Sequence, residues 1–222
     1  MSVEAVTGLL LIALPVLFNV SFAALAKLFD YPDVLRRPTV EILAAFEAGG
    51  ERLLLAWWAF ASSAVLFIPA AVLLSRSLPG ADADVLALAT AIGVAAGIAQ
   101  AVGLLRWPFA VPYLARHREE PGIDAAFQAI HRALGVGVGE HLGYLLTGAW
   151  TLFAGIAMTQ SPEVPDVLGW VAIAISPLFA IGALEFIGKF ERDGWKLAGD
   201  LVPIAYVVWS LWLLATGIAL LA

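Results

Sequence analysis

Three residues that could do chemistry stand close together in an otherwise apolar stretch, GEHLGYLLT, at positions 139–147. Glu140, His141 and Tyr144 could transfer a proton, bind a polar ligand or pair with a charge on another helix. An ionisable residue inside a membrane-spanning segment is costly, so it usually has a partner or a function. On an α-helix Glu140 and Tyr144 share a face, and His141 lies about 100° away from Glu140.

The residue types exclude several chemistries. The chain has no Cys, so no disulfide framework or thiolate nucleophile is available, and three His leave little material for a metal site. The signatures of zinc metalloproteases, serine hydrolases and di-iron bundles are missing. Glu140 and His141 diverge on a helix and cannot easily chelate one ion together. We therefore expect no metal site, and the sequence identifies neither a cofactor nor a catalytic residue.

The composition is that of a membrane protein. Hydrophobic residues make up 62% of the 222 positions, charged residues only 14%, and the mean hydropathy is +0.92. The net charge of -6 is spread over the loops, and Lys and Arg form no basic stripe, so nucleic acid is not an expected partner. We expect a multi-pass protein whose first partner is the lipid bilayer.

Six segments are long and apolar enough to cross a bilayer, which takes about 20 residues. The predicted spans are 5–26, 53–74, 85–105, 133–158, 167–187 and 201–222, all in a single domain covering residues 1–222. Segments 38–48 and 122–132 are predicted to be interfacial helices on the membrane surface. Pro108 and Pro112 are expected to end the regular helix after the third span. The predicted fold class is all-α, a polytopic membrane helical bundle of six transmembrane helices and two cytoplasmic-side interfacial helices.

The basic residues orient these spans. Eleven of the 12 Lys and Arg residues fall in the first, third and fifth connections, and only Arg76 lies on the other side. Cytoplasmic loops hold the excess of Lys and Arg. The asymmetry predicts that those three connections are cytoplasmic and that the N and C termini lie outside.

With this orientation, the polar residues of the spans fall at similar depths. At about 1.5 Å per residue, they lie within roughly 17 Å of the cytoplasmic boundary, and no polar track crosses the outer half of the membrane. A channel would need polar groups through its whole depth, so a cytoplasm-facing pocket is favoured. The candidate ligand-binding residues are Arg106, Glu140, His141, Tyr144, Gln100 and Glu185.

Each polar feature also has a structural interpretation. An Arg106–Glu140 ion pair could simply pin two helices together, and Glu185 could pair with Lys189 at the interface. At 100° per residue, His131 points away from Glu140, so it belongs to the site only if it serves a neighbouring helix.

Small residues repeat every four positions on two predicted spans. Such ridges most often let two helices approach closely in lipid. They are Ala89, Gly93, Gly97 and Ala101 on the third span, and Gly135, Gly139, Gly143 and Thr147 on the fourth.

Three segments resemble a known family. RWPFAVPYLA at 106–115, GEHLGYLLTGAWT at 139–151 and YPDVLRRPTVEILAAF at 31–46 are similar to a bacterial family of multi-pass integral membrane proteins catalogued only as a domain of unknown function. The resemblance implies a helical protein of the bacterial cytoplasmic membrane. It implies no activity, cofactor or catalytic residue.

Three functions therefore remain open. The first is binding of a small amphiphile or an anionic headgroup in the predicted pocket, with or without transport or sensing. The second is an accessory or structural subunit of a membrane assembly or homo-oligomer, which the two ridges and short loops favour. The third, ranked below these, is a membrane enzyme with Glu140 as acid or base, His141 as its partner and Arg106 stabilising an anion.

Overall fold

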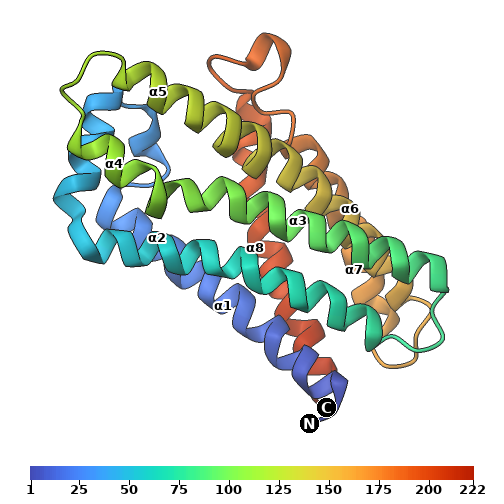
Figure 1. Cartoon of the computed structure of the whole chain (residues 1–222). Coiled ribbons are helices and arrows are strands. Elements are labelled where there is room, and N and C mark those ends of the chain that lie inside the picture. Colours follow the sequence, from blue (N-terminus) through green and yellow to red (C-terminus); the bar gives the residue numbers. More distant parts are fainter.

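The computed structural model describes residues 1–222 as a protein built of helices without strands (Figure 1). Both termini lie at one end of the elongated molecule. The elements in chain order are α1 (Val3–Phe29), η1 (Asp33–Arg36), α2 (Thr39–Arg76), α3 (Ala83–Phe109), α4 (Val111–Arg116), α5 (Ile123–Ile130), η2 (His131–Leu142), α6 (Gly143–Met158), α7 (Asp166–Gly182), η3 (Gly188–Phe190) and α8 (Lys196–Ala219).

Six long helices form a closed ring. Each of α1, α2, α3, α6, α7 and α8 packs against the next in this order, and α8 returns to pack against α1. Short links favour such antiparallel neighbours in helical bundles. The predicted all-helical bundle is confirmed.

The outer surface of the ring is apolar. Large hydrophobic side chains are exposed along the helices, for example Val20 on α1, Trp170 on α7 and Leu211 on α8, each more than 60% exposed. Such an extended apolar surface indicates contact with lipid. Five helical stretches are long and apolar enough to span a membrane, and α7 is a shorter apolar helix of 17 residues. The count of six spans, like the outside location of the termini, stays a prediction.

The first predicted interfacial helix is continuous with the span that follows it. Residues 38–48 and 53–74 belong almost entirely to α2, and the backbone breaks between them only at Gly50, with φ 57° and ψ -150°. This region of backbone space is nearly restricted to glycine, so Gly50 accounts for the change of direction.

The second predicted interfacial helix differs more. Helix α5, η2 and α6 run from Ile123 to Met158 without a break, as a rod parallel to α3 in Figure 1. At 1.5 Å per residue the 8 residues of α5 and the 16 of α6 alone would extend about 36 Å, which already exceeds the bilayer core of about 30 Å. Segment 122–132 is thus continuous with the span that follows it and is not a separate helix, while its position at the membrane surface stays a prediction.

The two prolines after the third span also act differently from the prediction. Helix α3 includes Pro108 and continues to Phe109, and Pro112 lies in the first turn of α4. A proline is tolerated in a first turn because the amide it lacks would have no intrahelical acceptor there.

The interior is divided into two hydrophobic cores. The larger core lies between the long helices toward the termini and contains Phe67, Trp150 and Trp209. The second lies at the opposite end, where η1, α4 and α5 pack on α2, and is centred on Trp57 and Trp107, whose rings stack at 4.4 Å.

Candidate functional site

Arg106 lies at the end of α3 and is already engaged by the protein. Its side chain is buried, and its Nη1 donates to the carbonyl oxygen of Gly103, one turn earlier. Its Nη2 donates to Nδ1 of His131 at 3.2 Å, and its guanidinium carbon lies 5.4 Å from the ring centre of Trp107. All ion pairs of the structure lie elsewhere, so the Arg106–Glu140 bridge, which was the structural interpretation of these two residues, is not formed.

His131 serves a neighbouring helix, which is the alternative left open for it, since it bonds to Arg106 of α3; its own segment, His131–Leu142, is a π-helix. Its i to i+5 hydrogen bonds turn the chain by only about 85° per residue, compared with 100° in an α-helix. Over nine residues this change brings His131 from the opposite side of the helix to within about 45° of Glu140. Because arginine can only donate, His131 accepts through Nδ1 and carries its proton on Nε2.

The glycine ridge of the fourth span packs against α3. A Cβ on Gly135 would lie 2.6 Å from the Arg106 guanidinium carbon, and one on Gly139 would lie 2.9 Å from the Cα of Gly103. A Cβ on Gly143 would lie 3.0 Å from the side chain of Gln100. The close helix packing expected from this ridge is therefore present.

The ridge on α3 packs against other helices of the same chain. A Cβ on Gly93 would lie 2.5 Å from both Ala71 and Trp150, and one on Gly97 would lie 2.7 Å from Ile68. Both ridges are thus used inside the molecule.

Two more of the predicted residues have hydrogen-bond partners. Gln100 donates through Nε2 to Thr147 Oγ1 at 2.6 Å, which joins α3 to α6. His141 lies 2.7 Å from the carbonyl oxygen of Ala183 through Nδ1, which ties η2 to the end of α7. Since a carbonyl only accepts, His141 carries a proton on Nδ1. These side chains hold helices together.

Glu140, Tyr144 and Glu185 have no such partners. No hydrogen bond or ion pair engages their side-chain oxygens, although all three residues are half-buried. The expected Glu185–Lys189 ion pair is not formed. The side-chain oxygens of these three residues keep some exposed surface. The fully buried side-chain atoms that lack a hydrogen-bond partner belong to other residues: Nε1 of Trp57, Trp107 and Trp150, and Oγ1 of Thr216.

Tyr31 belongs with this second group, and the sequence reasoning did not include it. It follows α1 outside the regular helices, is half-buried, and its hydroxyl has no partner in the protein. Burial raises its pKa, and the negative charge of Glu140 raises it further. A tyrosine next to a proline-rich turn carries no periodic signal, so only the three-dimensional fold brings it near Glu140.

The negative charge of Glu140 also affects the pKa of Glu185. Glu185 lies in the loop after α7, where burial and then the carboxylate of Glu140 raise its pKa to about 7, while Arg36 opposes the shift and Asp200 adds to it. The negative charge of Glu140 therefore affects the pKa of a group in each of two other segments.

The aromatic contacts place this region at the boundary between the two cores. Tyr206 of the larger core stacks on Phe18 of the smaller one, with ring centres 5.2 Å apart. Tyr144 meets Tyr206 edge to face at 5.7 Å. Tyr144, and with it the adjacent turn that carries Glu140, therefore lies where the apolar interior changes from one core to the other.

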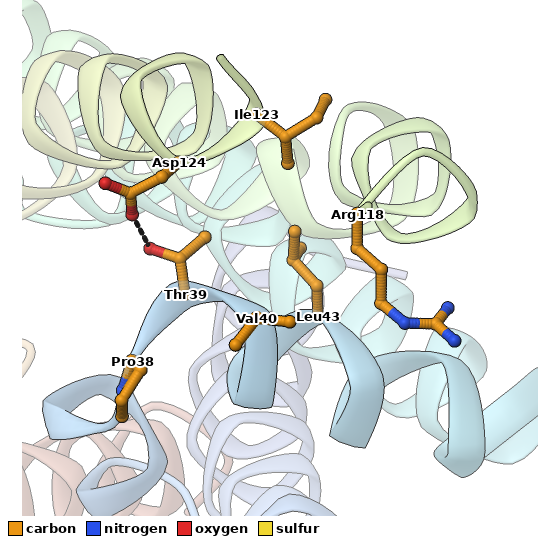
Figure 2. Close-up of a pocket in the computed structure, with 7 residues that line it drawn as sticks. All are labelled: Pro38, Thr39, Val40, Leu43, Arg118, Ile123 and Asp124. Carbon is orange, nitrogen blue, oxygen red and sulfur yellow. Dashed lines mark hydrogen bonds between the residues drawn. The ribbon is translucent and has the colours of Figure 1, made fainter. Parts of the chain in front are cut away.

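Two hollows on the surface lie away from this region. One, of about 350 Å³, separates the start of α2 from α5 and is bridged by a hydrogen bond from Thr39 to Asp124 (Figure 2). The other, of about 330 Å³, is an apolar groove beside Trp58 and Phe109 on the lipid-facing side of α2 and α3. Neither is lined by any of the six predicted site residues.

Residues 6–217 match the family described as Domain of unknown function (DUF4386), so the chain belongs to this family. The resemblance noted in the sequence is thereby confirmed. No curated protein and no solved structure matches the chain.

Proposed function

We propose that this member of the DUF4386 family binds a small amphiphile at the boundary between its two cores, with the headgroup held by Glu140, Tyr144 and Glu185. The proposal places the protein in the bacterial cytoplasmic membrane with this region near the cytoplasmic side. One observation carries it: Glu140 is a half-buried carboxylate within a membrane helix, and no protein group pairs with it. Such a group needs a partner, and a ligand can supply one.

The six candidate residues have two roles in this proposal. Arg106, His141 and Gln100 position the helices, because their polar atoms already bond to the protein. Glu140, Tyr144 and Glu185 keep accessible oxygens and are the groups that meet the headgroup.

The accessory-subunit alternative loses its main support. It rested on short loops and on two small-residue ridges free to pack against another protein, and both ridges pack within the chain. The enzyme alternative required His141 and Arg106 to act with Glu140, and both are engaged elsewhere. Ligand binding is therefore the function that the geometry supports best.

The test is a binding measurement with defined amphiphiles. The purified protein in a neutral detergent is titrated with dodecylamine, dodecanoate and dodecanol, each below its solubility limit in that detergent, using isothermal titration calorimetry. We expect at least one of them to bind with one-to-one stoichiometry. Glu140→Gln should weaken that binding about 10- to 150-fold, because a hydrogen bond to a charged group contributes about 1.5–3 kcal/mol.

The matched control is Glu163→Gln, which changes an exposed glutamate in the loop between α6 and α7. It should bind as the wild type does. If none of the three amphiphiles binds, or if Glu140→Gln and Glu163→Gln bind alike, the proposal is wrong.

A further inference from the structure

The apolar groove on the lipid-facing side lies between α2 and α3 and has a volume of about 330 Å³. It is lined by Leu54, Leu55 and Trp58 of α2 and by Pro108 and Phe109 at the end of α3. Leu55, Trp58 and Phe109 are each more than half exposed. An exposed apolar surface of a membrane helix contacts hydrocarbon, so an acyl chain is the kind of group that this groove accepts.

The groove has one end that is set by the order of the helices. Helices α2 and α3 pack side by side and run in opposite directions, and α4 follows α3 and packs against α2 (Figure 1). Residues shortly before Leu54 and residues shortly after Phe109 therefore lie at the same end of the groove. This end is the one opposite the termini, and the distribution of Lys and Arg predicts that it is cytoplasmic.

Two arginines without an ion-pair partner lie at this end. Arg52 precedes Leu55 by three residues, and Arg116 follows Phe109 by seven, so each lies on the same side of its helix as a residue that lines the groove. Ala110 between α3 and α4 has φ -88° and ψ -45°, so the helical winding continues to Arg116. Both arginines are exposed, and neither belongs to any ion pair of the structure.

One unpaired acid lies at the same end. Glu51 precedes Leu55 by four residues, is exposed, and forms no ion pair. Together with the two arginines it leaves one net positive charge there. Trp58 and Tyr113 are exposed beside these residues, and tryptophan and tyrosine are enriched at the depth of the lipid headgroups. The groove thus joins an apolar surface to a net positive charge.

We propose that this groove binds one phospholipid of net negative charge, with an acyl chain between α2 and α3 and the phosphate against Arg52 and Arg116. A guanidinium group matches the geometry of a phosphate and forms charge-assisted hydrogen bonds with it. Basic sites between membrane helices on the cytoplasmic side bind anionic headgroups in this way. The site shares no residue with the one around Glu140, so this inference is independent of the proposed function.

Trp58 reports on the occupant of the groove because it lines it. The full-length protein is reconstituted into phosphatidylcholine vesicles in which part of the lipid is replaced by phosphatidylglycerol or phosphatidylcholine brominated on the acyl chains. Bromine quenches nearby tryptophans, and the difference in quenching between a protein and its Trp58→Phe derivative isolates Trp58. We expect brominated phosphatidylglycerol to bind about fivefold more tightly than brominated phosphatidylcholine, the preference that one basic residue near a membrane surface gives.

Three charge variants and a control test the headgroup contacts. Arg52→Gln and Arg116→Gln should each abolish the preference for phosphatidylglycerol, and Glu51→Gln should increase it about fivefold further. The control is Lys27→Gln, which removes an exposed cation without an ion-pair partner from the last turn of α1. It should keep the preference of the wild type. All four positions are exposed, so these changes should leave folding intact.

Two outcomes would overturn the proposal. If Arg52→Gln and Arg116→Gln change the preference no more than Lys27→Gln does, anionic lipids gather by general attraction and not at a site. If neither brominated lipid quenches Trp58, another protein or a second copy of the chain covers the groove. Glu140→Gln should leave the quenching of Trp58 unchanged, so the failure of this proposal and the failure of the proposed function are measured separately.

Discussion

The closest approach between two helices in the site lies where Gly103 of α3 meets Gly139 of η2. A Cβ added to Gly103 would lie 2.5 Å from the Cα of Gly139, and one added to Gly139 would lie 2.9 Å from the Cα of Gly103. Both contacts are with backbone atoms, so no flexible side chain can move aside. The variants Gly103→Ala and Gly139→Ala should therefore push the two helices apart.

The size of the effect follows from these distances. Ordinary contact begins at 3.4 Å, so the added methyl groups are 0.9 Å and 0.5 Å too close, and Gly103→Ala should be the more harmful. Overpacking of this kind costs about 1–3 kcal/mol. At about 2–4 °C per kcal/mol for a chain of this length, the apparent melting temperature should fall by roughly 2–12 °C.

The control is Gly137→Ala in the same helical segment. Its Cβ would meet only the carbonyl oxygen of Arg132, at 3.3 Å, so it should cost little, and alanine favours helix by about 0.5–1 kcal/mol over glycine. Melting curves in neutral detergent, followed by tryptophan fluorescence, compare the three variants with the wild type. If Gly103→Ala and Gly139→Ala melt no lower than Gly137→Ala, the two helices are not in backbone contact.

Two further predictions concern the break in α2 and the titration of Glu185. Gly50→Ala should lower the free energy of unfolding by about 1–3 kcal/mol, because the backbone angles φ 57° and ψ -150° strain any residue that has a Cβ. An unchanged melting curve would show that α2 can straighten at this position without an energetic cost. Because folding raises the pKa of Glu185 from 4.5 to about 7, its stabilising contribution is complete below pH 4.5 and is lost as the pH rises through about 7. The melting temperature of the wild type should therefore fall as the pH rises from 4.5 through about 7. Glu185→Gln should remove this part of the fall, although Glu140, Arg36 and Asp200 still face the position. Identical pH profiles for the wild type and the variant would refute the raised pKa of Glu185.

Much of the fold could be predicted because hydrophobic length and small-residue spacing are local signals. The apolar segments appear as helices, and Gly135, Gly139 and Gly143 pack against α3 as their spacing indicates. The continuous rod from α5 to α6 was not predictable in the same way. Its amphipathic first part resembles a surface helix in sequence, and its docking on α2 through Thr39 depends on contacts far apart in the chain.

The candidate site was predicted in part. The residue types of Glu140, Tyr144 and Glu185, and their similar depths along the predicted spans, are local features that indicate this region. The pairing of Arg106 could not be predicted, because the 100° rule of the α-helix turned His131 away from the site. Tyr31 and Phe18 could not be assigned either, since an aromatic residue in an apolar segment has the same pattern whether it faces lipid, a core or a ligand.

The glycines of η2 connect packing with the position of the charged groups. Three glycines within twelve residues, Gly135, Gly137 and Gly139, weaken the preference for α-helical winding, and a π-helix can form where packing favours it. Two of them let α3 approach closely enough for Arg106 to reach His131, and this hydrogen bond keeps the guanidinium away from Glu140. A standard α-helix here would turn His131 away and release Arg106 to pair with Glu140. The same small residues that bring the helices together thus keep Arg106 from forming an ion pair with Glu140.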